Sequence, residues 1–421
     1  MRSDETTFSL AVFNKLSGPL SKAISLGDDG RPISDASDCK MSAGRARNVA
    51  VNGLLGLSKL IADLDSEQAL ALGQILVADD GEVLDIVTKD ALTGAPDQIA
   101  RTKDYIGFTE GQPSLLLIDF DQKGMPAEIR ERIAGAGGAW KLICEVVPDL
   151  AAAGHLRRAS TSAGLHNEET GEEYEGSGGE HIYVAVADAA DIPRATKVLH
   201  QRLWLAGLGW IWVGSIGQVL ERSLVDHSVG SPERLVFEGP PVLLPPLEQS
   251  DLARRPVVSE GTVIETHTVL RDLDARERAR FQVIVRDKKR QLQPEADALR
   301  KRADDRLARD LADKTGIELQ VAKVQISKRH RGELLPLHPL QFDDPELGDV
   351  TVADVLLNPD RFVEQTLADP LEGVAYGRNK AKVFSRDDGS LWINSFAHGG
   401  ARYDLIHDAG TLYALLEEIR E

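Results

Sequence analysis

The stretch SLLLIDFDQKG, residues 114–124, joins an apolar run to two carboxylates at its end. Four consecutive apolar residues, 115–118, are typical of a short strand that is buried on both faces. Because side chains two apart on a strand point to the same side, we expect Asp119 and Asp121 to present their carboxylates together. Two adjacent negative charges are unfavourable unless a cation lies between them. The stretch therefore predicts either a metal site, which needs a third ligand from elsewhere, or a solvated Asp pair at a strand end.

Composition limits the possible classes of protein. The 421 residues favour two or three domains, and the formal net charge of -18 argues against binding nucleic acid through overall charge. Local basic strips remain candidates for that role, namely Lys328–Arg331 and Lys380 with Lys382. The two cysteines, Cys39 and Cys144, are too few for a disulfide framework or a thiolate zinc site, so no zinc is expected. No segment has the apolar length of a membrane span and the N-terminal residues lack a signal-peptide core, so we expect a cytoplasmic protein that does not bind membranes.

The order of apolar and helical patterns predicts an α+β fold. Residues 1–250 alternate short apolar runs with helical patterns, which favours a mixed sheet with helices packed on it. The run HIYVAVAD, residues 181–188, is a second candidate strand. A helical pattern interrupted by glycines covers residues 125–147. Another helix is expected after Asp191, which can cap it while Pro193 suits the first turn.

The rest of the chain differs in composition. Proline-rich residues 238–256 mark a domain boundary. We predict a linker and a charged, exposed helical arm over residues 251–315, in which Pro294 would kink or restart the helix. Residues 316–421 contain short strands and turns and end in a helix from about Thr411, which predicts a small C-terminal α+β domain.

A third acid follows a similar but shorter apolar pair. Leu224 and Val225 lead into Asp226, and three carboxylates together suit a hard cation such as Mg²⁺ or Mn²⁺. By itself, Asp226 is more typical of a turn or a helix cap. The acid is therefore a candidate metal ligand only in combination with the first two.

A glycine-rich turn precedes the second candidate strand. Ser177, Gly178 and Gly179 come shortly before His181, which opens that strand. Backbone amides in such a turn can approach a phosphate closely, and a histidine there can donate a hydrogen bond to a phosphate oxygen. A lone histidine beside a strand is also common as a structural residue, so this turn is a weak signal when taken alone.

These pieces, in this order, resemble the three motifs of the archaeo-eukaryotic primase superfamily, and more closely the primase-polymerases of bacterial plasmids and phages. The resemblance covers roughly residues 100–240 and 366–405. It implies a catalytic core in which an RNA-recognition-like mixed sheet lies beside a small α/β unit. One departure is that Ser177 lies four residues before His181, whereas the family has a compact Ser-X-His, so the role of the serine is open.

The resemblance also implies roles for individual residues. The acids that match the family's metal ligands, and so would bind two divalent ions, Mg²⁺ or Mn²⁺, are Asp119, Asp121 and Asp226. His181 would contact the triphosphate of the incoming nucleotide. Arg222 and Arg234 flank the third motif and would bind triphosphate or template, although a structural salt bridge is equally consistent with each. Lys123 would be a supporting charge in the turn after the first motif.

The implied function is that of a DNA primase and polymerase for plasmid, phage or mobile-element replication. Its partners would be a single-stranded DNA template, nucleoside triphosphates and a helicase on another chain, since no Walker-type motif is present here. A metal-dependent nuclease could use the same acids, and a replication initiator could keep the fold without catalysis. The chemistry is expected within residues 1–250, while the region after it would hold template or the first nucleotide during initiation, or would dock a helicase.

Overall fold

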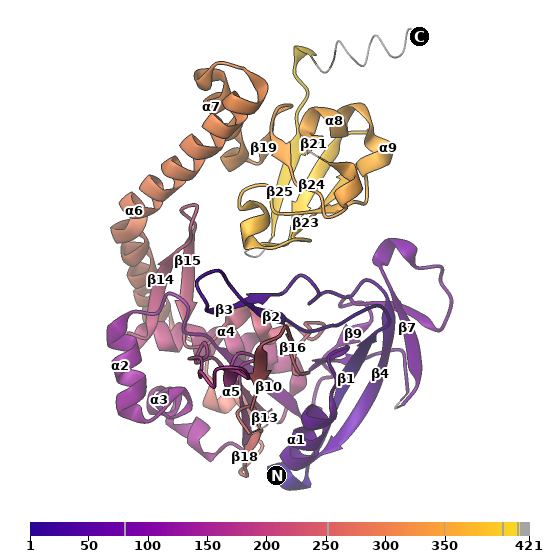
Figure 1. Cartoon of the computed structure of the whole chain (residues 1–421). Helices are drawn as coiled ribbons and strands as arrows, with labels where there is room; N and C mark the ends of the chain where they lie inside the picture. The colour runs from indigo at the N-terminus through magenta and orange to yellow at the C-terminus, as the bar shows by residue number, and fades with distance from the viewer. Residues whose placement is uncertain (80, 251, 349, 398–399, 411, 413–421) are drawn as a thin grey trace. The chain divides into compact units, whose positions relative to one another are not determined.

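The computed structural model describes residues 1–421 except 80, 251, 349, 398–399, 411 and 413–421 (Figure 1). Its contacts divide the chain into two compact units. The first consists of Met1–Trp212 with Leu220–Gln291, and the second consists of Val213–Val219 with Leu292–Glu421. The division at residues 250 and 315 stays a prediction from sequence, and the helix expected from about Thr411 lies outside the described residues.

The first unit is a mixed α+β structure with two main sheets, of strand orders β5-β1-β4-β7-β8 and β10-β13-β11-β18. Figure 1 shows β1, β4 and β7 side by side in the first of these. The strands of the two sheets are β1 (Thr7–Lys15), β4 (Gly44–Asn52), β5 (Gln68–Ala71), β7 (Val83–Val87), β8 (Gln98–Ala100), β10 (Ser114–Phe120), β11 (His155–Ala159), β13 (Glu180–Val186) and β18 (Val257–Ser259). Shorter pairings are made by β2 (Ala23–Leu26), β3 (Pro32–Asp35), β6 (Gln74–Ile75), β9 (Ile106–Gly107), β12 (Leu165–Asn167), β14 (Gly209–Val213), β15 (Val219–Ser223), β16 (Val242–Leu243) and β17 (Leu247–Gln249).

The helices of the first unit lie mainly between these strands in sequence. They are α1 (Gly53–Asp63), α2 (Ala127–Ala136), α3 (Ala139–Val146), α4 (Ile192–Leu205) and α5 (Thr266–Val269), with the 3-10 turns η1 (Ser3–Glu5), η2 (Lys89–Ala91), η3 (Pro148–Ala152), η4 (Ala189–Asp191) and η5 (His227–Gly230). The long helix α6 (Ala275–Thr315) begins in this unit and ends in the second. It continues through Pro294 without restarting.

Local sequence explains where two of these helices begin and end. Gly137 ends α2 in the left-handed conformation, with φ of 79°, and the backbone then passes through Gly138 into α3, so the expected break at glycines is confirmed. Pro193 lies in the first turn of α4, as expected. Asp191 occupies the N-cap position, but the predicted cap is wrong, because its carboxylate accepts hydrogen bonds from the side chains of Arg194 and Thr266 and from no backbone N–H of α4.

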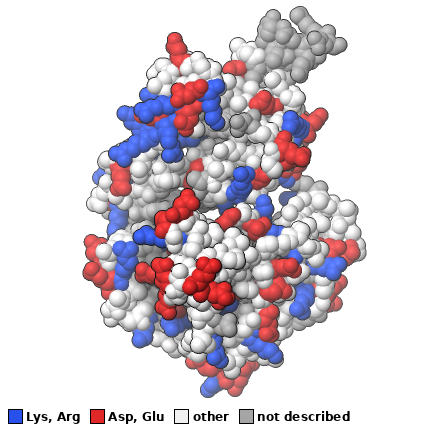
Figure 2. Space-filling view, in the orientation of Figure 1, with Lys and Arg blue, Asp and Glu red and all other residues white. Residues whose placement is uncertain are grey.

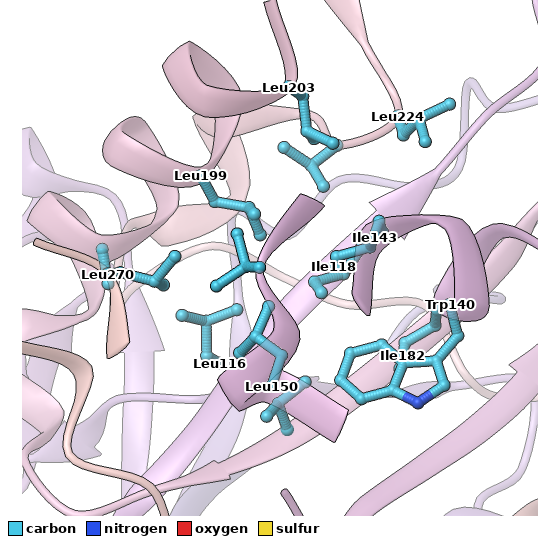
Figure 3. Close-up of a cluster of buried hydrophobic side chains, with 14 of the residues drawn as sticks. Leu116, Ile118, Trp140, Ile143, Leu150, Ile182, Leu199, Leu203, Leu224 and Leu270 are labelled. Atoms are coloured by element: carbon cyan, nitrogen blue, oxygen red, sulfur yellow. The ribbon is translucent and has the colours of Figure 1, made fainter. Parts of the chain in front are cut away.

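Strand β10 is buried on both faces, as its apolar run predicts. Leu116 and Ile118 face a core shared with α3 and α4, where they meet Trp140 and Leu199 (Figure 3). The alternate residues of the strand, including Leu115, face a second core built mainly from β1 and α1. At about 25 cal/mol per Å² of apolar surface, burial on both sides makes this strand a strongly fixed element. Its polar end is therefore held in one position.

The second unit has its own sheet and core. Its five-stranded sheet has the order β19-β25-β24-β23-β22, and its core lies under that sheet. Its strands are β19 (Glu333–Leu334), β20 (Pro339–Leu340), β21 (Val350–Thr351), β22 (Thr366–Leu367), β23 (Ala381–Ser385), β24 (Leu391–Ser395) and β25 (Ala401–Leu405). Its helices and turns are α7 (Leu319–Ser327), α8 (Val352–Leu357), α9 (Pro359–Phe362), η6 (Lys328–Arg331), η7 (Pro345–Leu347) and η8 (Gly373–Tyr376). Among the described residues of the whole chain, no helix combines the length and apolar character needed to cross a lipid bilayer.

Candidate active site

The antiparallel pairing of β10 with β13 brings an acid and a histidine together. The register places Asp119 directly opposite His181. Oδ1 of Asp119 lies 3.6 Å from Nε2 of His181. Two candidate residues that are about sixty positions apart in sequence are therefore neighbours because of strand pairing.

The third acid approaches the same strand end through its backbone. The N–H of Asp226 donates a hydrogen bond to the carbonyl oxygen of Asp119 at 3.1 Å. Leu224 and Val225 are buried in the core beneath β10, which anchors the segment. The carboxylate of Asp226 also accepts a hydrogen bond from the backbone of Ser228 at 2.9 Å and caps η5. Asp226 is thus a cap residue, which was one of the alternatives expected from the sequence, and it also lies beside Asp119.

Asp121 lies just beyond β10, in a turn that its own side chain helps to form. It accepts a hydrogen bond from the N–H of Lys123 at 3.0 Å. Gly124 follows with φ of 67°, and a Cβ at this position would collide with Trp212. The ammonium of Lys123 lies 4.8 Å from the centre of the Trp212 ring. The turn thus holds Lys123 close to Asp121.

One small cavity of about 40 Å³ is shared by the three acids. Its lining residues are Asp119, Asp121, Lys123, Glu221, Arg222, Ser223, Val225, Asp226 and His227. A cavity must offer roughly 10–15 Å³ to hold one water molecule. The space is therefore large enough for an ion or a water molecule.

The surroundings of Asp119 in this cavity disfavour its negative charge. Burial, and next the neighbouring carboxylates of Asp226 and Asp121, raise the pKa of Asp119 above its ordinary value, against the attraction of His181. Burial would also raise the pKa of Asp226, but the hydrogen bonds from Ser228 and the nearby arginines hold it below its ordinary value. The cavity therefore disfavours one of its own negative charges, as expected where a cation would be bound.

Both candidate arginines lie near the acids. Arg222 lines the cavity, and its guanidinium lies 5.5 Å from the centre of the Trp212 ring. Arg234 donates a hydrogen bond to Oγ of Ser228 at 2.8 Å and lies 4.0 Å from the carboxylate of Asp226. The side chain of Arg234 is 45% exposed, so it can also reach an added anion.

The glycine-rich turn lies beside the Asp121 loop rather than in the cavity. Gln122 donates a hydrogen bond to the carbonyl oxygen of Gly178 at 3.0 Å. Ser177 accepts a hydrogen bond from the N–H of Gly179 at 3.3 Å, and its hydroxyl pairs with that of Ser160 at 2.9 Å. Ser177 therefore shapes the turn, and Ser160 is a partner that the sequence motifs did not identify.

A buried network behind His181 was also missed by sequence analysis. Glu238 is 1% exposed, and its Oε1 accepts hydrogen bonds from Nδ1 of His181 at 2.7 Å and from the Tyr183 hydroxyl at 2.6 Å. Its Oε2 accepts a hydrogen bond from Arg158 at 2.7 Å, and Arg254 donates to the carbonyl oxygen of Glu238 at 3.3 Å. With Nδ1 bound to Glu238, the ring of His181 is oriented so that Nε2 faces Asp119.

This network favours a charged pair of histidine and glutamate. Burial alone would raise the pKa of Glu238, but His181, Arg158 and Tyr183 hold it at about 2. Burial would likewise lower the pKa of His181, but Glu238 and then Asp119 raise it above its ordinary value. A protonated His181 can donate hydrogen bonds from both ring nitrogens at once.

Two further ionisable residues line the cavity without having been expected. Glu221 forms an ion pair with Lys289 of α6 at 2.5 Å. His227 packs on His200 with ring centres 4.5 Å apart, and His200 in turn pairs with Ser223 at 2.9 Å. In sequence, His227 directly follows Asp226, and that adjacency was the available signal for it.

The acids fit a hard divalent cation by donor type and charge, since carboxylate oxygens are the ligands that Mg²⁺ and Mn²⁺ prefer. Their spacing is not that of a ready-made coordination shell. Within the described residues, no group of three or more His, Cys, Asp and Glu side chains is arranged to hold a metal ion. The carboxylates would therefore have to draw closer around an ion.

Comparison of the chain with protein-family models, with curated proteins and with solved structures finds no match. The arguments about function therefore rest on the residues of this chain and their geometry.

Proposed function

We propose that the protein is a template-directed DNA primase and polymerase with a catalytic core of the archaeo-eukaryotic primase type. One observation carries the proposal, namely that side chains from three separate segments meet at one end of the β10–β13 pair. Asp119 faces His181, and Asp121 and Asp226 line the same cavity as Asp119. Nucleotidyl transfer needs such a combination, because acids and phosphate-binding groups must act on the same triphosphate.

The proposed cofactors are divalent ions, Mg²⁺ or Mn²⁺, which Asp119, Asp121 and Asp226 would hold. Bound cations would neutralise phosphate charge and lower the pKa of the attacking hydroxyl. The cations of the protein itself, Lys123 and Arg222, lie at the cavity and would offset the negative charge of a triphosphate.

His181 is the proposed donor to a phosphate oxygen of the incoming nucleotide. Its Nδ1 is bound to buried Glu238, so Nε2 is the ring nitrogen left on the side of the acids. Donation from a charged group makes a stronger hydrogen bond than donation from a neutral one. Arg234 and the backbone N–H of Gly178 are further proposed contacts for phosphates. The N–H groups of Ser177 and Gly179 already donate to the hydroxyls of Ser162 and Ser177, so these two amides, expected from the sequence to bind phosphate, are not open to a ligand.

The proposed reaction joins the 3′-hydroxyl of one nucleotide to the α-phosphorus of the next and releases pyrophosphate. Its partners would be a single-stranded DNA template, nucleoside triphosphates and a helicase on another chain. A nuclease would use the acids to cleave a strand with water, and would have no use for a histidine that binds triphosphate. A replication initiator would bind DNA without either reaction.

The test uses the full chain with a single-stranded template, Mg²⁺ or Mn²⁺, and labelled ribonucleotides or deoxynucleotides in separate reactions. We expect lengthened products and release of pyrophosphate in step with nucleotide incorporation. Strand cleavage without pyrophosphate release would contradict the proposal in favour of a nuclease. Template binding with neither reaction would contradict it in favour of a non-catalytic initiator.

A further inference from the structure

The second half of α6 carries an excess of exposed positive charge. The exposed charged side chains of residues 301–315 are Lys301, Arg302, Arg306, Arg309, Asp310, Asp313 and Lys314. Five of these seven are cations, whereas the chain as a whole has a formal net charge of -18. Figure 2 shows Lys and Arg gathered over the α6–α7 segment, at the upper left of the view.

Two other acids of the same segment are bound elsewhere. Asp304 forms ion pairs with Arg329 at 2.7 Å and with His330 at 2.8 Å. Asp305 forms an ion pair with Lys323 of α7 at 3.0 Å. These carboxylates tie α6 to α7 and η6, so they do little to neutralise the exposed cations.

In the basic run Lys328–Arg331, a candidate strip in the sequence, two of the cations have structural roles. Arg329 is 2% exposed and bound to Asp304, and Lys328 forms an ion pair with Glu333 at 3.0 Å. A buried and paired guanidinium cannot reach an external phosphate. Lys328 and Arg329 are therefore engaged within the protein, whereas Arg331 is exposed.

Three arginines of α6 form a row on one face of the helix. Arg302, Arg306 and Arg309 follow the spacing that places side chains on the same side of a helix. The opposite side carries Ala308 and Leu311, which are buried against α7. The arginines rise along the helix axis by about 6 Å and then about 4.5 Å. Among the described residues, no ion pair joins any of the three to an acid.

We propose that this arginine row binds the phosphodiester backbone of a nucleic acid. The guanidinium fork matches phosphate oxygens in a bidentate manner, and a repeated row of forks suits a polymer with a repeated charge. The acidic remainder of the chain repels the same polymer, so binding is directed to this face. The choice of nucleic acid as the anionic partner rests on the proposed function.

The test compares the full chain with the variant R302Q/R306Q/R309Q. Binding of a fluorescent oligothymidylate, and of a duplex of equal length, is measured by anisotropy over a range of salt concentrations. We expect the variant to bind at least tenfold more weakly. The slope of log Kd against log salt should fall by about two for the single strand, since each lost phosphate contact removes ~0.7 from it. Circular dichroism verifies that the variant is folded.

Two control variants sharpen the result. R276Q/R280Q/R286Q removes three exposed arginines from the first half of the same helix and should leave the slope unchanged. R302K/R306K/R309K keeps the charge of the row and should keep most of the slope. An equal loss of slope in the first control, or an unchanged slope in R302Q/R306Q/R309Q, would overturn the proposal. Polyglutamate serves as an anionic polymer without phosphates. The proposal would also be overturned if R302Q/R306Q/R309Q lost binding to polyglutamate and kept its binding to both oligonucleotides.

A separate variant distinguishes this inference from the proposed function. Asp119→Asn should abolish nucleotide incorporation and keep the salt slope of the unmodified chain. Incorporation that survives Asp119→Asn would contradict the polymerase proposal and leave the arginine row standing. Conversely, an unchanged slope in R302Q/R306Q/R309Q, together with loss of incorporation in Asp119→Asn, would reject the arginine row alone.

Discussion

Asp119 and His181 lie opposite each other across the β10–β13 pair, with Oδ1 and Nε2 3.6 Å apart. The other nitrogen of the histidine ring is bound to buried Glu238 at 2.7 Å. A continuous line of polar contacts thus runs from the interior of the first unit to the acid cavity. The histidine is held on two sides, so its orientation does not depend on a ligand.

Removing the charge of Asp119 and removing the charge of Asp226 should change the stability of the protein in opposite directions. The fold raises the pKa of Asp119, so its negative charge opposes folding at neutral pH, and Asp119→Asn should increase the free energy of unfolding. The fold lowers the pKa of Asp226, so its charge favours folding at neutral pH, and Asp226→Asn should decrease the free energy of unfolding. Urea denaturation at pH 7 measures both. Destabilisation by Asp119→Asn would contradict the charge imbalance described for the cavity.

His181→Ala should weaken nucleotide binding ten- to hundredfold, because a hydrogen bond to a charged group contributes roughly 1.5–3 kcal/mol. Tyr183→Phe is the matched control, since it removes another hydrogen bond to the same Oε1 of Glu238 and leaves the histidine in place. It should cost about 1 kcal/mol of stability and leave nucleotide affinity within about threefold. Equal loss of affinity in the two variants would mean that His181 acts through the stability of the network.

The sequence predicted those parts of the site that depend on local pattern. The apolar run of β10 and the glycine break between α2 and α3 have periodic or conformational signals, and both features are present. The pairing of Asp119 with His181 depends on the register of two distant segments, which no local pattern sets. The primase-like motif order suggested that these residues meet, and strand pairing is the physical reason that they do.

The residues that were missed lack such signals. Glu238 is a single acid between an apolar run and two prolines, and its burial becomes favourable only because Arg158, His181 and Tyr183 surround it. Likewise, the run at Lys328 has the composition of an exposed strip, but Arg329 is buried because its guanidinium forms an ion pair with Asp304 of α6. Whether such a residue is buried depends on partners that are distant in sequence, so a local segment does not predict it.

The stability of both units should fall in mild acid because each buries a neutral histidine. Burial, and then His227, lower the pKa of His200 to about 3, while burial and then Arg329 lower that of His338 to about 3. The unfolded chain binds protons at these residues below about pH 6.5 and the folded chain does not, so stability falls as the pH decreases from about 6.5 toward 3. Each histidine should cost about 2 kcal/mol at pH 5 relative to pH 7.

Urea denaturation of the unmodified chain at pH 7 and pH 5 measures this loss. His200→Gln and His338→Gln should each reduce the difference between the two pH values, although both lower stability at pH 7. A difference that neither variant changes would contradict the assignment to these histidines.

The position of a truncation should decide whether the first unit folds. Strand β18 completes the β10-β13-β11-β18 sheet, and Leu270 and Leu273 are buried in the adjacent core. A chain that ends near residue 250 lacks all three, so we expect it to lose cooperative unfolding, whereas a chain that ends at Gln291 should keep it. Thermal denaturation followed by circular dichroism distinguishes the two.

The chain that ends at Gln291 should extend an annealed primer and lose most synthesis from an unprimed template. Initiation lacks the paired primer, so it depends more on a second unit that holds the template. Equal loss of the two activities in the folded truncation would contradict this division of labour. Undiminished priming would instead assign the second unit to docking of a helicase.

The central claim is that Asp119, Asp121 and Asp226 act together in nucleotidyl transfer. The most direct measurement is the rate of pyrophosphate release by the full chain on a single-stranded template with Mg²⁺ or Mn²⁺, compared with the rates of D119N, D121N and D226N. We predict release in step with incorporation by the unmodified chain, and a loss of at least a hundredfold in each variant that still unfolds cooperatively. Near-normal release by any one of the three folded variants, or its absence from the unmodified chain with every nucleotide and ion tested, would contradict the account.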